Sequence, residues 1–167
     1  MSIAQSLLPE FDHEVAGTRK VLERIPADKF DWRPHPKSFS LGQLANHTSN
    51  LVSWGHVTLR TTELDLSPKD GEVMRMPIAT DAAGLVANLD GAAKETRAAL
   101  EAAADADFGV AWTLKGGDQV YFTMPRGAVL RNMVFNHLVH HRAQLTVYLR
   151  LLDVPVPGLY GPSADEA

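Results

Sequence analysis

Histidine is the residue type best suited to chemistry in this sequence, which has seven histidines and no cysteine. His137 and His141 are four positions apart in a segment of helical periodicity, so their side chains leave the helix in directions that differ by only about 40°. Both imidazoles can then reach one metal ion from the same side of the helix. Burying them without partners would cost on the order of 1–3 kcal/mol each, and a shared cation would avoid that cost. The same spacing also occurs on solvated helix faces, which stays open as an alternative.

His47 is a further histidine that points inward from a predicted helix. The neighbouring positions on its own helix face, Leu44 and Leu51, are apolar. Three inward imidazoles could form one metal site. The alternative is a core histidine whose ring hydrogen-bonds to a carbonyl group. We assign the other histidines to helix flanks, a loop and the surface: His13, His35, His56 and His140.

Amphipathic periodicity predicts the helices that must position these residues. Apolar residues recur at steps of three and four in four separate segments. These segments are residues 3–25, closed by Pro26; residues 41–63, with Ser40 as N-cap; a segment from the cap at Thr80 and Asp81 to Ala103; and residues 127–152, ended by Pro155 and Pro157.

A small β-hairpin is predicted between the third and fourth helices. Residues 112–114 and 120–122 are rich in strand-forming side chains, and they flank a turn signal at Gly116 and Gly117. No internal repeat interrupts the chain. We therefore predict an all-α fold, a four-helix bundle with this hairpin, in a single domain that covers residues 1–167.

Composition limits the function classes. The chain is 45% hydrophobic and 22% charged, which is ordinary for a globular domain that needs no metal or disulfide to fold. Its 16 Lys and Arg against 20 Asp and Glu give a net charge of -4, so we expect no nucleic-acid partner. It has no apolar run of membrane-spanning length and no basic leader at the N-terminus. We expect no membrane partner and a cytoplasmic location.

Several segments resemble the DinB/YfiT-like metalloprotein family. The similarity spans nearly the whole chain, is most specific in the last helix and the tail, and is weakest in the third helix. The matching segments are Asp31-Trp-Arg-Pro34, Ser40-Leu-Gly-Gln-Leu-Ala-Asn-His47, Asn136-His137-Leu-Val-His-His141-Arg-Ala-Gln-Leu145 and Tyr160-Gly-Pro-Ser-Ala-Asp165.

This resemblance implies a fold, a site and an activity. The family folds as a four-helix bundle with long crossover connections, often pairs as a homodimer, and holds a divalent ion with one histidine of the second helix and two of the fourth. Those positions match His47, His137 and His141. Relatives in the wider superfamily resemble S-transferases and isomerases that use a low-molecular-weight thiol. Since this chain has no cysteine, the thiol would arrive as a cosubstrate.

Three neutral ligands without a carboxylate leave a divalent ion its full charge and an open position, which is the catalytic type of site. Nitrogen ligands favour zinc or nickel over iron or manganese. Such an ion can activate water or bind an incoming thiolate. The resemblance favours the thiolate.

Candidate neighbours of the site follow from helical spacing, and each has a structural alternative. Asn50 and Gln144 could orient a ligand imidazole, and Trp54 either lines a pocket or packs in the core. Arg142 meets an anionic substrate group or lies on a solvated helix face. The resemblance implies that Tyr160 docks near the helices. No residue is assigned as a general base, and apolar residues that could cover a homodimer partner are Leu8, Val52 and Leu151.

The sequence thus supports one main functional hypothesis with two alternatives. The main hypothesis is a metal-dependent enzyme that transfers a low-molecular-weight thiol to a small electrophile. The first alternative is a metal-binding or stress-related bundle without turnover. The second is a hydrolase that uses metal-activated water at the same three histidines.

Overall fold

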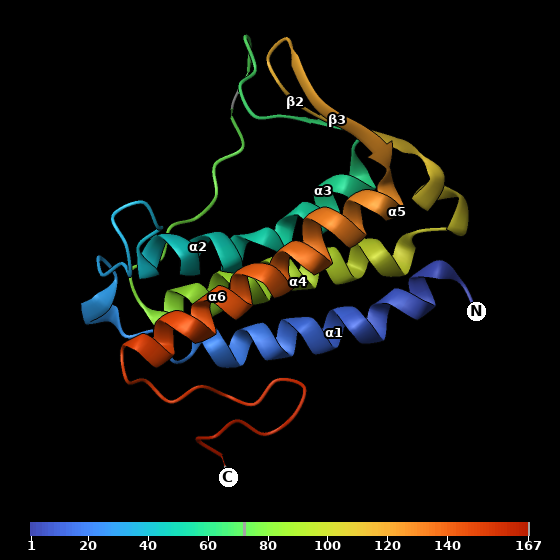
Figure 1. Ribbon diagram of the computed structural model, residues 1–167. Coiled ribbons are helices and arrows are strands. Elements are labelled where there is room, and N and C mark those ends of the chain that lie inside the picture. The colour runs from blue at the N-terminus through green and yellow to red at the C-terminus, as the bar shows by residue number, and fades with distance from the viewer. Residues whose placement is uncertain (72, 167) are drawn as a thin grey trace.

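The structure, a computed structural model, describes residues 1–71 and 73–166 and is mostly helical with one small sheet (Figure 1). Within these residues, no helix has the length and apolar character needed to cross a membrane. The α-helices are α1 (Ile3–Leu22), α2 (Leu41–Leu51), α3 (Ser53–Arg60), α4 (Ala82–Ala102), α5 (Arg126–Val129) and α6 (His137–Leu151). The other elements are the 3-10 helices η1 (Ala27–Lys29) and η2 (Asp105–Gly109), the π-helix η3 (Leu130–Asn136) and the strands β1 (Glu63–Asp65), β2 (Ala111–Gly116) and β3 (Gln119–Pro125).

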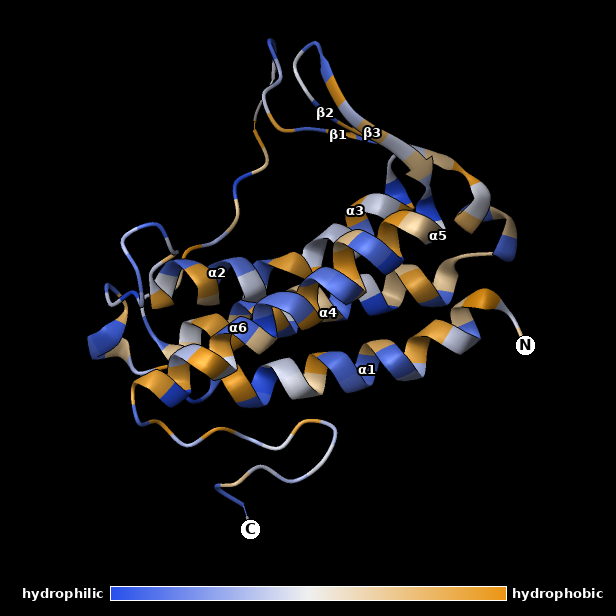
Figure 2. Cartoon of the chain, in the orientation of Figure 1, coloured by the Kyte–Doolittle hydropathy of each residue, from blue (hydrophilic) through white to orange (hydrophobic). Residues whose placement is uncertain are grey.

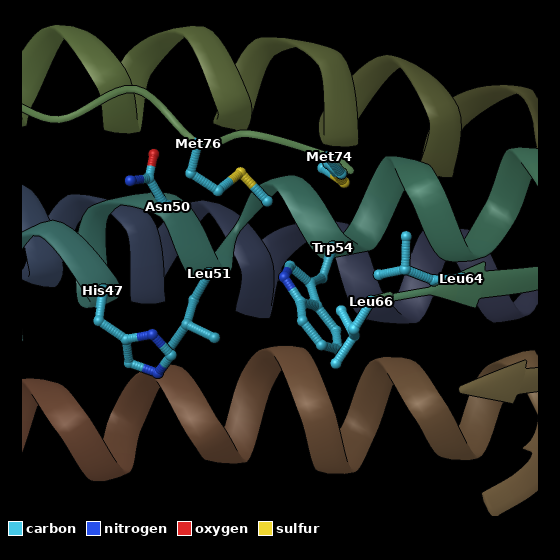
Figure 3. A pocket seen from close by; sticks show the side chains of 8 residues that line it. All are labelled: His47, Asn50, Leu51, Trp54, Leu64, Leu66, Met74 and Met76. Atoms are coloured by element: carbon cyan, nitrogen blue, oxygen red, sulfur yellow. The ribbon is translucent and has the colours of Figure 1, made fainter. Parts of the chain in front are cut away.

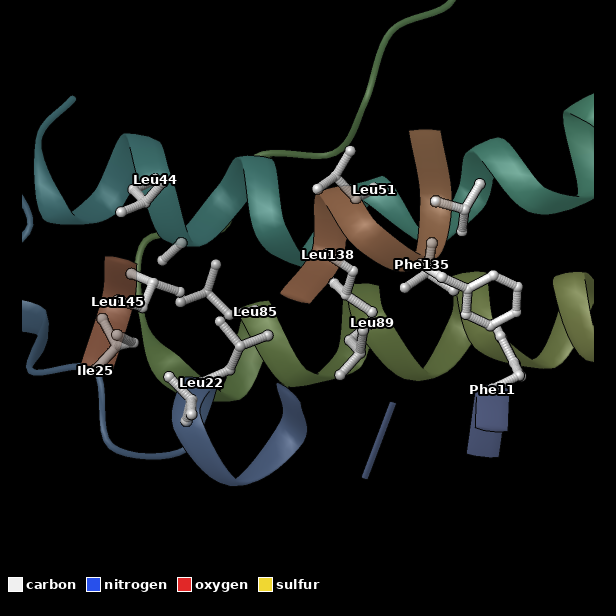
Figure 4. Packing of buried hydrophobic residues seen from close by; sticks show 14 of the residues in the cluster. Phe11, Leu22, Ile25, Leu44, Leu51, Leu85, Leu89, Phe135, Leu138 and Leu145 are labelled. Carbon is white, nitrogen blue, oxygen red and sulfur yellow. The ribbon is translucent and has the colours of Figure 1, made fainter. Parts of the chain in front are cut away.

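The apolar faces of the long helices meet in one core. Figure 2 shows apolar and polar residues interspersed along each helix, as amphipathic helices require. The core side chains come from α1, α2, α4, η3 and α6 (Figure 4), and they include Phe11, Leu44, Leu89, Phe135 and Leu138. This packing fixes α2 against α6, the two helices on which the predicted ligand histidines lie.

The predicted helix starts are confirmed by side-chain caps. The Ser40 hydroxyl accepts from the Gln43 backbone N–H at 3.2 Å, and the Gln43 side chain accepts from the Ser40 N–H at 2.9 Å. The Asp81 carboxylate caps α4 by accepting from the Gly84 N–H at 2.7 Å. The first helix ends at Leu22 rather than at Ile25, because Pro26 disfavours a helical conformation at the residue before it.

The second predicted helix is interrupted, so its prediction as one element over residues 41–63 is wrong. The Thr96 hydroxyl of α4 accepts from the His56 N–H at 3.1 Å and donates to the Val52 carbonyl at 2.7 Å. The Thr96 hydroxyl thus takes the place of the direct helical hydrogen bond from the His56 N–H to the Val52 carbonyl. This insertion separates α2 from α3. Gly55 permits this approach, since a Cβ atom there would lie 2.3 Å from Cγ2 of Thr96.

The predicted hairpin is present, but it belongs to a three-stranded sheet. Strands β2 and β3 pair antiparallel, and β1 adds to β2 in parallel with Glu63 opposite Thr113. The prediction of Glu63, the first residue of β1, as the end of a helix is therefore wrong. The side chain of Asp65 accepts from the Gly117 N–H at 2.9 Å and so ties β1 to the hairpin turn. Gly117 has the positive φ of +60° that this turn requires.

The last predicted helix is not α-helical throughout. Residues 130–136 form the π-helix η3, which runs directly into α6 at His137. Hydrophobic periodicity is averaged over windows of 11–18 residues and does not detect such a local widening. π-Helical turns are frequent at functional sites, and this one immediately precedes a predicted ligand.

We expect the contact between Gly55 and Thr96 to control the junction of α2 and α3. Gly55→Ala should lower the free energy of unfolding by about 1–3 kcal/mol, because the new methyl group overlaps Cγ2 of Thr96. Thr96→Ser removes Cγ2 and keeps the hydroxyl, so the same glycine substitution should cost less in that background. Urea unfolding of the double-mutant cycle measures the difference. Equal costs in both backgrounds would contradict this account.

Candidate metal centre

His47, His137 and His141 converge between α2 and α6, as predicted. Their ligand nitrogens all lie within 4.8 Å of one another. Nε2 of His137 is 3.5 Å from Nε2 of His47 and 2.8 Å from Nε2 of His141. All three side chains are half-buried. In the part of the chain that the structure describes, no carboxylate joins this cluster.

The neighbours of the rings determine which nitrogens face the cluster. Nδ1 of His141 lies 2.8 Å from Oε1 of Gln144. Since this oxygen can only accept, Nδ1 carries the proton and the Nε2 lone pair of His141 faces the cluster. Nδ1 of His137 is buried and makes no hydrogen bond of good geometry within the described residues. Burial lowers the pKa of His137, and the backbone of Met133 opposes this shift.

The arrangement fits a divalent ion. Two nitrogens bound to one zinc ion at about 2.0–2.1 Å in tetrahedral geometry are roughly 3.3 Å apart. The 3.5 Å between His47 and His137 matches this separation, whereas the 2.8 Å between His137 and His141 is shorter. Rotation of either ring can widen the short distance. Lone pairs that face one another in a half-buried site are stabilised by a cation, so the cluster is compatible with a divalent metal ion.

The electrostatics keep these imidazoles neutral, as metal ligands must be. Burial, and to a smaller extent the neighbouring His141 and His137, lower the pKa of His47 from 6.5 to about 4. Burial also lowers the pKa of His137 and of His141. Gln144 opposes this shift in the pKa of His141 through its hydrogen bond.

The other predicted neighbours of the site have separate roles. Gln144 orients His141, as predicted. Asn50 contacts no ligand imidazole, since its amide donates to the Pro77 carbonyl at 2.8 Å. Trp54 is partly buried and lines a cavity beside His47. The Phe39 ring, 6.2 Å from the His47 ring, was not anticipated, because no periodicity relates an exposed loop residue to a helix.

Both interpretations of Arg142 are wrong. The side chain is only 2% exposed and forms an ion pair with Glu14 of α1 at 2.6 Å. It also donates to the Tyr160 hydroxyl at 2.6 Å, so the predicted docking of Tyr160 against the helices is confirmed. One sequence signal could have revealed this burial, because Arg142 lies in the helical stripe of Leu138, Leu145 and Leu149.

The remaining histidines lie outside the cluster. His140 and His13 are exposed, and His35 lies in the loop before α2, as predicted. The assignment of His56 to solvent is wrong, because its side chain is only 18% exposed and lies 3.5 Å from a carboxylate oxygen of Glu95. The expected partner-facing role of Val52 is also wrong, since Val52 is fully buried.

The fold and the site define a class of protein: mostly helical, with three histidines from two helices that could hold one divalent ion. A family model described as the DinB superfamily matches residues 10–145. The chain therefore belongs to the DinB superfamily.

Individual relatives agree with this assignment. The uncharacterized protein YrdA of Bacillus subtilis is 26% identical over 163 residues, which cover 95% of this chain and 89% of YrdA. A DinB-like protein of Bacillus cereus has a similar structure, with a TM-score of 0.69, 22% identity and coverage of 93% of this chain and 97% of that one. The DinB-like protein YjoA of Bacillus subtilis gives a TM-score of 0.66 at 19% identity, over 90% and 95% of the two chains. These structural similarities support the fold.

The lowered pKa of His47 predicts acid sensitivity of the metal-free protein. Above pH 6.5 His47 is neutral in both the folded and the unfolded chain, so its protonation does not lower the free energy of unfolding. As the pH falls from 6.5 toward 4, the unfolded chain takes up the proton first, so the free energy of unfolding decreases. Urea unfolding in the presence of chelator, between pH 7.5 and 4.5, measures this decrease.

Two variants serve as controls for this pH dependence. His47→Gln should show a smaller decrease than the parent, and His35→Gln, in an exposed loop, should show the same decrease as the parent. A His47→Gln variant with the full pH dependence of the parent would contradict the assignment.

Proposed function

We propose that this protein is a metal-dependent enzyme that transfers a low-molecular-weight thiol to a small electrophile. The observation that carries the proposal is the convergence of three neutral imidazoles, with no carboxylate of the described residues in the cluster. Such a ligand set leaves a divalent ion its full charge and an open coordination position. When bound, the ion would act as a Lewis acid that favours the deprotonated form of a coordinated thiol. Zinc or nickel suits these nitrogen ligands better than iron or manganese does.

The residues of the chain would prepare the site for this chemistry. Gln144 holds His141 with its Nε2 lone pair free, and burial keeps His47 neutral. The chain has no cysteine, so the reacting sulfur belongs to the cosubstrate. In the transfer the thiol gives its S–H proton to water, and the freed sulfur electron pair forms a bond to the electrophilic carbon. The bond from that carbon to the leaving group breaks, and the leaving group departs with the bonding electron pair. No oxidant or reductant is needed.

The proposal also covers the arrangement of the helices, the oligomeric state and the cellular location. The packing of α1, α2–α3, α4 and α6 along one another supports a four-helix bundle in which residues 61–81 form a long crossover connection. We propose that the protein acts as a homodimer in the cytoplasm. Leu151, 58% exposed on α6, is an apolar residue available to such a dimer interface.

A metal site without turnover is the second candidate function. It is favoured by the position of the cluster, because an ion held there would link α2 to α6 and could act as a structural clamp. In that case chelation should lower the melting temperature strongly, and no substrate should turn over.

The proposed activity is tested by incubating zinc-loaded and nickel-loaded protein with L-cysteine or glutathione and a panel of small alkyl and aryl halides. We expect thioether formation well above the uncatalysed rate, at least tenfold lower in His47→Ala and unchanged in His35→Ala. Thioether formation equal to the uncatalysed rate with both metals would contradict the transferase. Thiol-independent hydrolysis of p-nitrophenyl acetate would instead support a hydrolase at the same site.

A further inference from the structure

A cavity of about 200 Å³ lies beside the histidine cluster. Its walls come from α2, α3, β1 and the connection between β1 and α4 (Figure 3). His47 belongs both to the histidine cluster and to this wall, so the cavity adjoins the proposed metal site. We call it the His47 cavity. Its main apolar lining residues are Trp54, Leu64, Leu66, Met74 and Met76.

The described lining residues of the His47 cavity carry no charged side chain. Among its described lining residues, only His47 and Asn50 are polar, and no Lys, Arg, Asp or Glu is present. The amide of Asn50 is engaged by the Pro77 carbonyl. In the metal-free protein, an ionised group placed here would lose its hydration without gaining a partner of opposite charge. The cavity therefore favours an uncharged, apolar occupant.

One wall of the cavity belongs to the connection between β1 and α4, and hydrogen bonds hold the end of this connection against α2. The Asn46 amide donates to the Ala79 carbonyl at 2.9 Å and accepts from the Ala79 N–H at 2.7 Å. One helical turn later, Asn50 binds the Pro77 carbonyl. The Ser53 hydroxyl lies 3.6 Å from the sulfur of Met76. Together these contacts hold residues 76–79, and with them Met76 of the cavity wall, against α2 and α3.

The size of the cavity sets the size of the occupant. An apolar cavity of roughly 150 Å³ in another protein is large enough to bind benzene. At about 200 Å³, the His47 cavity has room for one phenyl ring with a short substituent. The thioether side chains and the indole of its wall are polarisable and suit contact with an aromatic ring.

We propose that the His47 cavity binds the uncharged hydrocarbon part of the electrophile, of about the size of a benzyl group, next to the metal site. The substrate class would then be small apolar electrophiles rather than charged ones. The role in catalysis rests on the proposed function, whereas the binding of an apolar group to the cavity does not.

The direct test is a titration of the metal-free and the zinc-loaded protein with benzyl alcohol, benzylammonium and benzoate, followed by NMR at the Trp54 indole N–H. We expect saturable shifts with benzyl alcohol in both forms and, in the metal-free protein, at least tenfold weaker binding of the two charged probes. Met76→Gln should weaken the binding of benzyl alcohol about tenfold, because it buries an amide in the apolar wall. Leu66→Gln, at a partly exposed wall position, should weaken it in the same direction.

Val73→Gln is the matched control, since Val73 is exposed in the same connection and does not line the cavity. It should leave the affinity for benzyl alcohol unchanged. The absence of a saturable shift at Trp54, equal binding of the charged probes to the metal-free protein, or equal effects of Met76→Gln and Val73→Gln would each overturn the inference. Saturable binding as expected, without thioether formation in the zinc-loaded or nickel-loaded protein, would support the cavity and contradict only the transferase.

Discussion

The structure depends on one electrostatic constraint: imidazole nitrogens meet between two helices, and no carboxylate within residues 1–71 and 73–166 joins them. Nε2 of His137 lies 2.8 Å from Nε2 of His141, and Gln144 leaves the His141 lone pair directed at the cluster. Protonation is a poor way to satisfy these lone pairs, because burial lowers the pKa of each ring. A divalent cation satisfies all of them at once, which is why the same geometry supports both metal binding and an open, reactive site.

This constraint requires α2 and α6 to hold a fixed height and rotation, and the surrounding irregularities provide that. On one side, the Thr96 hydroxyl hydrogen-bonds to the backbone at the junction of α2 and α3, and the missing side chain of Gly55 leaves space for it. On the other side, the buried pair of Arg142 and Glu14 joins α6 to α1 directly beside His141. Breaking a buried ion pair of this kind costs roughly 3–5 kcal/mol, so α6 resists rotation.

The sequence predicted the elements that depend on local chemistry. The spacing of His137 and His141, the inward position of His47, the cap at Ser40 and the turn near Gly117 all follow from residues close together in the chain. Features that depend on distant partners were not predictable in the same way. The break at Val52 is made by Thr96, β1 exists only through its pairing with β2, and the burial of Arg142 depends on Glu14. The relative height of α2 and α6 likewise has no signal in periodicity. The family resemblance supplied it, because it named His47 together with the other two histidines.

The central claim is that His47, His137 and His141 together hold one divalent ion. The most direct test is elemental analysis of the untagged protein, loaded with zinc and freed of excess metal, next to His47→Ala and His137→Ala/His141→Ala variants shown to be folded. The account predicts about one zinc per chain in the parent and in a His35→Ala control, and almost none in the double variant. Retention of one zinc per chain after removal of His137 and His141 would contradict it.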